Sequence, residues 1–287
     1  MSTASISEPI SGDKLYQERA RAAFPLLVRQ AQAGVPIYYS DLAEELEMPN
    51  ARNLNYVLGS IGQSLELLSK EWKEKVPPIQ CLVVNKSTGL PGEGIGWFLV
   101  KKEDFASLPL RQQRAIVEAE LQGVFTYPRW EKVLEFFSLE PTLADFAPIV
   151  SKASGGGFGG GESKHHKALK EYVAKNPEAI GLKASTPIGI TEQPLPSGDS
   201  LDVSFFNRKC WVAAEVKSAI SSEADIVRGL FQCVKYRAVM EAVQVSEARA
   251  QNARALLVLE STFPQSLVPL RNILGVEVVE GVSPKNG

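Results

Sequence analysis

Three segments of strand-like composition follow one another closely between residues 189 and 217, and they restrict the fold more than any other feature of the chain. Apolar and β-branched residues fill each segment, and short turn-forming stretches separate them. The expected elements, in order, are a helix at 162–175, strands at 189–195, 199–206 and 210–217, a helix at about 224–243, a strand at 255–260, a short helix near 263–272 and a strand at 276–279. This alternation predicts an α/β fold for the second half of the chain.

Three charged residues interrupt the apolar strand patterns. Asp202 lies between apolar neighbours in the second strand, and Glu215 and Lys217 lie in the third. Because residues two apart in a strand project from the same face, Glu215 and Lys217 point together while their apolar neighbours face a core. Two carboxylates and an amine are therefore expected to converge at one edge of a buried sheet.

This arrangement resembles the PD-(D/E)XK nuclease superfamily, which includes many restriction endonucleases and DNA-repair nucleases. The resemblance extends over about residues 162–279. Asp202 stands at the metal-binding aspartate of the superfamily, and Glu215-Val216-Lys217 stands at its (D/E)XK tripeptide. The resemblance implies a restriction-endonuclease-like mixed sheet with an αβββαβ core.

Further residues match elements of the same superfamily. Gln232 and Tyr236 on the following helix look like the QxxxY element, which supports the site and the nucleic acid. Glu162, near the start of the first helix, resembles a glutamate that often completes the metal shell, and Glu171 is the competing residue. The chain departs from the superfamily pattern at Leu201, where a proline would precede the aspartate.

The resemblance implies a Mg²⁺ site, in which Mn²⁺ can substitute. Mg²⁺ prefers carboxylate, carbonyl and water oxygens. The expected ligands are Glu162, Asp202, Glu215 and the backbone carbonyl of Val216. The ion would activate water and neutralise charge on the phosphate, while Lys217 would position that water or help to deprotonate it. The residues expected to take part in catalysis are Asp202, Glu215, Lys217, Gln232 and Tyr236.

The first part of the chain predicts three helices followed by a β-hairpin. The expected elements are a helix at 15–33, a helix from a cap at Ser40 to Met48, a helix at about 51–72, and strands at 79–85 and 95–100. This order is typical of an α+β winged helix-turn-helix domain, which we assign to residues 1–103. The same layout also serves as a protein–protein module, and the expected recognition helix carries few basic residues beyond Arg52. Contact with DNA and contact with protein are therefore open alternatives for this domain.

Composition changes most sharply at 154–161, with the sequence Ser-Gly-Gly-Gly-Phe-Gly-Gly-Gly. Such a run is typical of a flexible linker, and it separates a helical bridging segment at 104–153 from a nuclease domain at 162–287. The clearest helical parts of the bridging segment are 112–121 and 130–137. The glycines also fit a GxGxxG string, but no clear strand precedes them and the Lys-Ser/Thr ending of a phosphate-binding loop is missing. We therefore expect no cofactor site there.

Charge and hydrophobicity restrict the remaining classes of protein. The net charge of −2 and the pI of about 5.9 give no bulk attraction to nucleic acid, so contact with DNA requires local patches or metal ions. The sequence predicts no signal peptide, no membrane helix and no disulfide framework, which favours a cytoplasmic protein.

His165 and His166 are adjacent on a helix and point in different directions, so they are expected at the surface or facing a phosphate. The candidates for a basic surface that meets DNA are Arg111, Arg114, Lys164, Lys167 and Lys170.

These patterns predict a Mg²⁺-dependent DNA nuclease that acts in restriction, antiviral defence or DNA processing. A helix-turn-helix module upstream of such a nuclease resembles the layout of Mrr-type restriction endonucleases. Many members of the superfamily act as dimers, so the expected partners are DNA and a second copy of the chain. Two alternatives stay open. One is a non-catalytic nucleic-acid-binding or regulatory protein that keeps the nuclease-like part as a scaffold, and the other is a nuclease that acts on RNA.

Overall fold

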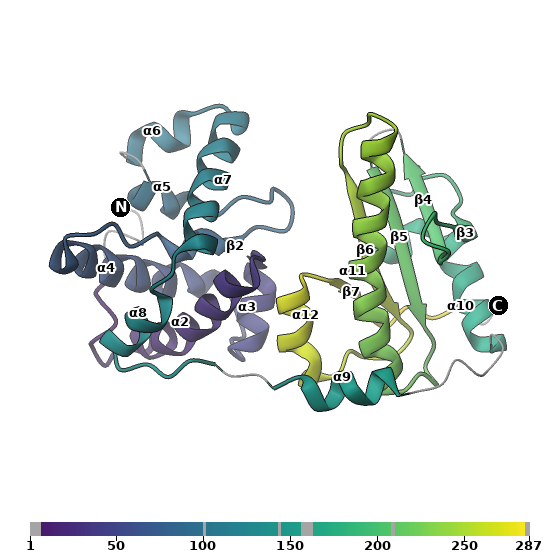
Figure 1. Cartoon of the computed structure of the whole chain (residues 1–287), viewed down its shortest axis with the longest axis horizontal. Coiled ribbons are helices and arrows are strands. Elements are labelled where there is room, and N and C mark those ends of the chain that lie inside the picture. The colour runs from purple at the N-terminus through teal and green to yellow at the C-terminus, as the bar shows by residue number, and fades with distance from the viewer. Residues whose placement is uncertain (1–6, 100–101, 143–144, 156–162, 208–209, 285–287) are drawn as a thin grey trace. The chain divides into compact units, whose positions relative to one another are not determined.

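The computed structural model describes residues 7–99, 102–142, 145–155, 163–207 and 210–284. The chain folds into two compact units, Met1–Ala144 and Asp145–Gly287 (Figure 1). The sequence predicts a domain boundary at the glycine run, 154–161. The two compact units divide earlier in the chain, between residues 144 and 145. Each unit has its own buried apolar core, as an independent domain requires.

Helix α9 (Ala147–Ser154) accounts for the earlier division. Its Ala153 side chain is buried among apolar residues of the long helix α11 (Glu223–Ser246), and the Ala153 carbonyl accepts a hydrogen bond from Arg228 of α11 at 2.8 Å. The segment at 104–153, expected to bridge two domains, is therefore divided between the two units. Most of the glycine run itself lies outside the described residues.

The first unit is mainly helical. Its elements, in order, are α2 (Leu15–Ala33), β1 (Ile37–Tyr38), α3 (Tyr39–Glu45), η1 (Ala51–Asn53), α4 (Leu54–Trp72), η2 (Ile79–Leu82), β2 (Val83–Val84), η3 (Glu93–Ile95), α5 (Gly96–Leu99), α6 (Lys102–Ser107), α7 (Leu110–Thr126) and α8 (Trp130–Phe136). The three helices expected at the start are present, and α2 has the expected bounds. Phe24 of α2, Ile61 of α4 and Leu134 of α8 are fully buried in one cluster.

The hairpin expected from segments 79–85 and 95–100 does not form in the described residues. The first segment is a 3₁₀ turn followed by β2, which pairs in parallel with β1. The second segment forms α5, and a Cβ atom at Gly96 would lie 3.1 Å from the Cβ of Phe105 in α6. A short apolar run fits a strand and a buried helix equally well, so the packing of α5 against α6 decides its structure. The prediction that these residues form the β-hairpin wing of a winged helix is therefore wrong.

From α10 onward, the second unit has the order of α-helices and strands that the sequence predicts. Its elements, in order, are α9, α10 (Lys164–Lys175), η4 (Pro177–Ile180), β3 (Ile190–Pro194), β4 (Ser200–Asn207), β5 (Cys210–Lys217), α11, β6 (Ala253–Leu259), η5 (Gln265–Leu267), α12 (Val268–Leu274) and β7 (Glu277–Val279). Strand β5 has the expected bounds, and the ends of the other strands differ from expectation by no more than two residues. The unit is therefore mixed α/β, as its sequence predicts.

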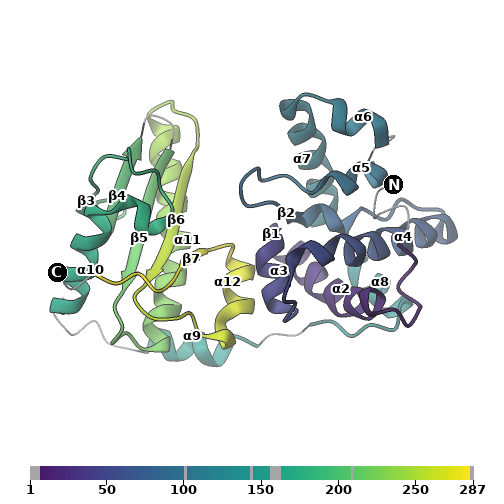
Figure 2. The same ribbon diagram turned by 180° about the vertical axis from the view of Figure 1, so that it is seen from behind.

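These strands form one five-stranded mixed sheet in the order β3-β4-β5-β6-β7. The pairs β3–β4 and β4–β5 are antiparallel, and β5–β6 and β6–β7 are parallel. Helix α11 crosses the front of the sheet in Figure 1 and lies behind it in Figure 2. Leu169 of α10 packs on one face with Val203 and Val216, and Val227 of α11 packs on the other with Leu257. The central strands are consequently buried on both faces.

Strand β4 changes the direction of its side chains at Asp202. Leu201 is buried with Tyr236 of α11, whereas Val203, only two residues later, is buried with the α10 side of the sheet. Residues two apart in a regular strand share a face, so the backbone must turn between them. Regular pairing with β5 begins at Val203 opposite Ala214. The chain around Asp202 therefore leaves the ladder with β5, although β4 pairs with β3 on both sides of this residue, and this frees backbone groups of β5 to meet a side chain.

The cysteines and the hydrophobic helices can also be placed. Cys81 and Cys233 are buried, Cys210 is half-buried, and none of these three described cysteines forms a disulfide. Of the helices in the described part of the chain, none combines the length and the apolar composition that crossing a membrane requires.

Candidate active site

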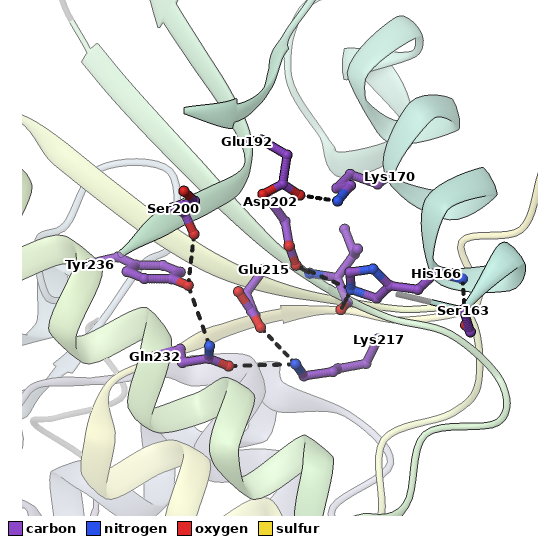
Figure 3. Close-up of polar contacts among 11 residues, drawn as sticks. Ser163, His166, Lys170, Glu192, Ser200, Asp202, Glu215, Lys217, Gln232 and Tyr236 are labelled. Atoms are coloured by element: carbon purple, nitrogen blue, oxygen red, sulfur yellow. Dashed lines mark hydrogen bonds and ion pairs between the residues drawn. The ribbon is translucent and has the colours of Figure 1, made fainter. Parts of the chain in front are cut away.

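Asp202, Glu215 and Lys217 lie close together in the second unit, as Figure 3 shows. Glu215 and Lys217 project from the same face of β5, and the Lys217 Nζ donates a hydrogen bond to the Glu215 Oε1 at 2.7 Å. Only 3% of the Glu215 side chain is exposed to solvent. The convergence that the sequence predicts from strand alternation is therefore present, and it lies in the interior rather than on an open surface.

The carboxylate of Asp202 takes the place of a missing backbone partner. Its Oδ2 accepts a hydrogen bond from the Val216 N–H at 2.9 Å, at the point where the β4–β5 ladder ends. Burial by itself would raise the pKa of Asp202, but the hydrogen bonds from His166 and from the Val216 N–H outweigh it and hold the pKa below its ordinary value. Asp202 is thus an ionised carboxylate fixed by β5.

Glu215 is in the opposite condition. Its Oε2 is buried and has no hydrogen-bond partner among the described residues. Burial, reinforced by the nearby charge of Asp202 and opposed by Lys217 and by the nearby Tyr236 hydroxyl, raises the pKa of Glu215 to about 7. Burial lowers the pKa of Lys217, but the charge of Glu215 outweighs it, so the pKa of Lys217 is raised and the amine stays protonated at neutral pH.

Helix α11 supplies the two residues that resemble the QxxxY element. The Gln232 Oε1 lies 3.5 Å from the Lys217 Nζ, and the Gln232 Nε2 donates to the Tyr236 hydroxyl at 3.4 Å. The Tyr236 hydroxyl in turn donates to the Ser200 carbonyl at 3.1 Å. Burial and then the charges of Glu215 and Asp202 raise the pKa of Tyr236, so its hydroxyl keeps its proton. These contacts join α11 to the start of β4 and support Lys217 from the helix side.

Gly229 is a positioning residue that sequence reasoning missed. A Cβ atom at this residue would lie 2.7 Å from the Leu257 Cδ1 and 3.0 Å from the Lys217 Cε. The glycine therefore lets α11 approach β5 where Lys217 extends towards Glu215. Its spacing of three residues before Gln232 places both on one face of the helix and is the signal that could have revealed it.

His166 is the second residue of the site that the sequence did not assign. Its Nε2 lies 3.0 Å from the Val216 carbonyl oxygen and 3.4 Å from the Asp202 Oδ2. Because a carbonyl oxygen only accepts hydrogen bonds, the Nε2 must carry a proton to bind Val216. The imidazole N–H therefore holds two of the groups expected to bind Mg²⁺. His165 is exposed, in agreement with the expectation that the two histidines point in different directions.

Helix α10 brings His166 to the site with the help of its own cap. Ser163 is the N-cap, and its Oγ accepts a hydrogen bond from the His166 backbone N–H at 3.1 Å. His166 lies on the same stripe of α10 as the buried Leu169, Lys170 and Val173, which have spacings of three, four and seven residues from it. A helix presents such positions on one face, so this stripe was the available signal that His166 faces the sheet.

Lys170 corrects one expectation about basic surface. Its side chain is 5% exposed and makes an ion pair with Glu192 of β3. Glu192 has a φ of 53°, in the left-handed region, at the position where β3 lies opposite the turn in β4. Lys170 is therefore a buried residue of the site, whereas Lys164 and Lys167 are exposed as expected.

A pocket of about 580 Å³ opens beside these groups. It is lined by Ser163, His166, Lys170, Glu192, Asp202, Lys217, Ser218, Ile220, Ser221 and Asp225. The lining mixes cations, carboxylates and hydroxyls. A phosphate group that entered it would meet Lys217, with Asp202 nearby to hold a metal ion.

The two carboxylates fit the expected metal ion. A divalent cation shared by Asp202 and Glu215 would give the buried Glu215 Oε2 a partner and offset the repulsion between the two charges. Among the described residues, no group of three or more His, Cys, Asp and Glu side chains is arranged to hold a metal. Glu162, the expected additional ligand, lies outside the described residues. Glu171 is exposed on α10 and does not line the pocket.

Comparisons with protein families, with characterised proteins and with solved structures find no significant match to the chain. The function must therefore be inferred from the site itself.

Proposed function

We propose that the second unit is a Mg²⁺-dependent nuclease with a restriction-endonuclease-like fold, which hydrolyses phosphodiester bonds in DNA. The observation that carries the proposal is the buried meeting of Asp202, Glu215 and Lys217 beside a polar pocket that Asp202 and Lys217 line, with the Glu215 Oε2 lacking a hydrogen-bond partner among the described residues. An unsatisfied buried carboxylate oxygen destabilises a folded protein by about 1–3 kcal/mol or more. A non-catalytic scaffold gains nothing from this arrangement, whereas a metal-dependent hydrolase needs it.

The residues of this chain divide the work of phosphodiester hydrolysis. Asp202, Glu215 and the Val216 carbonyl would hold Mg²⁺, which would supply an activated water and neutralise charge on the phosphate. Lys217 is protonated, so it orients the phosphate or the water and stabilises developing negative charge rather than accepting a proton. Gln232 holds the Lys217 amine from the helix side.

His166 acts as a positioning residue in this proposal. Its N–H is shared between the Val216 carbonyl and Asp202, so it orients both oxygens. Substitution of a residue that orients metal ligands in this way typically lowers metal affinity or activity by about 10–100-fold.

The test uses the full chain with Mg²⁺ or Mn²⁺ on duplex DNA, single-stranded DNA and RNA. Cleavage of DNA that depends on the divalent ion supports the proposal, and cleavage of RNA alone replaces it with the RNA-nuclease alternative. If neither ion supports cleavage of any of the three substrates, the enzyme proposal is lost. The homodimer and the restriction or defence setting follow from the superfamily resemblance and belong to the same proposal.

Replacing His166 by alanine is expected to lower the apparent affinity for Mg²⁺ or the cleavage rate by about 10–100-fold, because the Val216 carbonyl and Asp202 lose the group that orients them. His165→Ala is the matched control, since this neighbour is exposed. The measurement is the cleavage rate as a function of Mg²⁺ concentration. Equal effects of the two substitutions would contradict the role of His166.

Replacing Gly229 by alanine is expected to slow cleavage by about 10–100-fold, because the new methyl group displaces Lys217. The free energy of unfolding should change by less than about 2 kcal/mol, since alanine favours the helix while overpacking opposes it. Gly123→Ala in α7 is the control, because apart from its chain neighbours and the backbone of its own helix no described atom lies within 4 Å of the added Cβ. It should stabilise the chain by about 0.5–1 kcal/mol and leave cleavage unchanged. A wild-type rate for Gly229→Ala would show that this approach does not position Lys217.

A further inference from the structure

The first unit contains a second pocket, far from the nuclease residues in sequence and made by α4 and the segment that follows it. Its volume is about 510 Å³. The lining residues that matter here are Gly62, Glu66, Lys70, Lys73, Gln80 and Phe98. The pocket therefore combines an amide, an aromatic ring and charged side chains.

Gln80 is the most informative of these residues. It is 3% exposed, and neither its Nε2 nor its Oε1 has a hydrogen-bond partner among the described residues. Buried amides in folded proteins are normally satisfied, and each exception calls for an explanation. One explanation is a ligand that pairs with both atoms.

Phe98 and Gly62 form the surroundings of this amide. A Cβ atom at Gly62 would lie 2.3 Å from the tip of the Phe98 ring and 2.6 Å from the Gln80 Nε2. The glycine thus leaves the room in which the ring and the amide meet. A ring beside the amide can offer its N–H only a weak hydrogen bond, and the Oε1 would gain nothing from such a contact. Phe98 is half-buried on the one-turn helix α5, so its side chain can turn aside and admit a planar group to the amide.

The rim of the pocket supplies positive charge. Lys75 and Glu74 are engaged elsewhere, Lys75 with Glu120 at 2.8 Å and Glu74 with Arg129. Lys70 and Lys73 make no ion pair with another described residue. Glu66, an acidic residue of the pocket lining, likewise makes no ion pair with a described residue. Lys73 has a φ of 51° at the C-cap of α4, a left-handed position that glycine adopts more easily.

We infer that this pocket binds a nucleotide, with its base edge on the Gln80 amide, its ring against Phe98 and its phosphate at Lys70 and Lys73. A glutamine amide presents a donor beside an acceptor, and a nucleobase edge carries the complementary pair. Aromatic side chains stack on bases of any sequence. A carboxylate such as Glu66 suits a ribose hydroxyl. The nucleotide is either a free mononucleotide or one residue of a single strand, and the site does not depend on the nuclease proposal.

The experiment measures binding to the full chain by calorimetry in EDTA, which prevents cleavage. The probes are the four nucleoside monophosphates, ribose 5-phosphate and a short single-stranded oligonucleotide. At least one monophosphate or the oligonucleotide should bind at least about tenfold more tightly than ribose 5-phosphate, because ribose 5-phosphate has no base to pair with Gln80. Tighter binding of the monophosphate indicates a free nucleotide, and tighter binding of the oligonucleotide indicates a strand. The titration is repeated with Asp202→Asn and Lys217→Met. Unchanged nucleotide affinity in both variants supports binding in the pocket of the first unit, and weaker binding would place the phosphate at the nuclease site.

Two variants separate a binding role from a structural one. Gln80→Met removes the unsatisfied amide with little change in volume, and Lys73→Gly places glycine at a left-handed position. Each should weaken binding at least about tenfold while raising the melting temperature of the ligand-free chain. Lys75→Ala is the control, because it removes a rim charge that is already paired with Glu120. The inference is overturned if no nucleotide binds more tightly than ribose 5-phosphate, or if Gln80→Met binds as tightly as the wild type.

Discussion

Replacing Asp202 by asparagine, Glu215 by glutamine or Lys217 by methionine is expected to reduce the rate of DNA cleavage by about a thousandfold or more in each case. The first two substitutions remove a negative charge from the expected metal ligands, and the third removes the cation that faces the phosphate. All three nearly preserve side-chain volume. The asparagine oxygen can still accept the hydrogen bond from the Val216 N–H, so the turn in β4 should persist. The measurement is the single-turnover cleavage rate of a labelled duplex in Mg²⁺.

Asp199→Asn provides a control for these variants. Asp199 is a carboxylate just before β4 that accepts a hydrogen bond from Lys235 at 2.8 Å, and it does not line the pocket. We expect its rate to stay within a few-fold of the wild type. A wild-type rate for Asp202→Asn would rule out the proposed site. A comparable loss in Asp199→Asn would trace the effect to the fold rather than to chemistry.

In EDTA, the free energy of unfolding is expected to fall by about 3 kcal/mol as the pH rises from about 4.5 to 7. The pKa of Glu215 is about 7 in the folded chain, against an ordinary value of 4.5. Between these values the folded state holds a proton that the unfolded state has lost, so raising the pH favours unfolding. A shift of one pKa unit corresponds to about 1.4 kcal/mol. The stabilisation by protonated Glu215 is complete below the unfolded pKa and is lost as the pH passes through the folded one.

Glu215→Gln isolates this effect, because the amide does not titrate. The measurement is urea denaturation of wild type and variant at several pH values, and the difference between them cancels groups that titrate in both. Asp202 has a lowered pKa and Lys217 a raised one, so their contributions fall below and above this pH window. Parallel pH profiles for the two proteins would show that folding does not raise the pKa of Glu215.

Addition of Mg²⁺ should reverse the loss of stability at neutral pH. A divalent ion favours the ionised form of Glu215, and binding to the folded state alone raises the free energy of unfolding by mass action. The increase should be largest near pH 7 and should be absent in Glu215→Gln. An equal increase in both proteins would place the ion at another site.

The residues of the second unit show how far sequence reasoning reaches. Alternation in β5 predicted that Glu215 and Lys217 share a face, because the period of two is a local property of an extended chain. The same reasoning could not find Gly229, whose importance comes from how closely α11 approaches β5. His166 was visible only as one of two histidines, and the contact of its ring with Val216 depends on where α10 lies on the sheet.

The first unit shows the opposite limit. Its three leading helices follow from apolar periodicity, but the segment 95–100 could form a strand or a helix by composition alone. The packing of α5 against Phe105 decides for the helix over Gly96–Leu99. The two compact units likewise divide ahead of the glycine run, because α9 packs on α11 although it precedes that run.

By itself the sequence determined the order of helices and strands in the second unit and the charged residues that lie on β4 and β5, since both depend on short-range periodicity. Only the tertiary structure decided that Asp202 leaves the sheet ladder to bind the Val216 N–H, and that one oxygen of Glu215 is buried without a partner. These features depend on burial and on contacts between residues that are distant in the chain. Burial sets the pKa of a carboxylate and the cost of an unpaired oxygen, so the tertiary structure also decides the chemistry that these residues can perform.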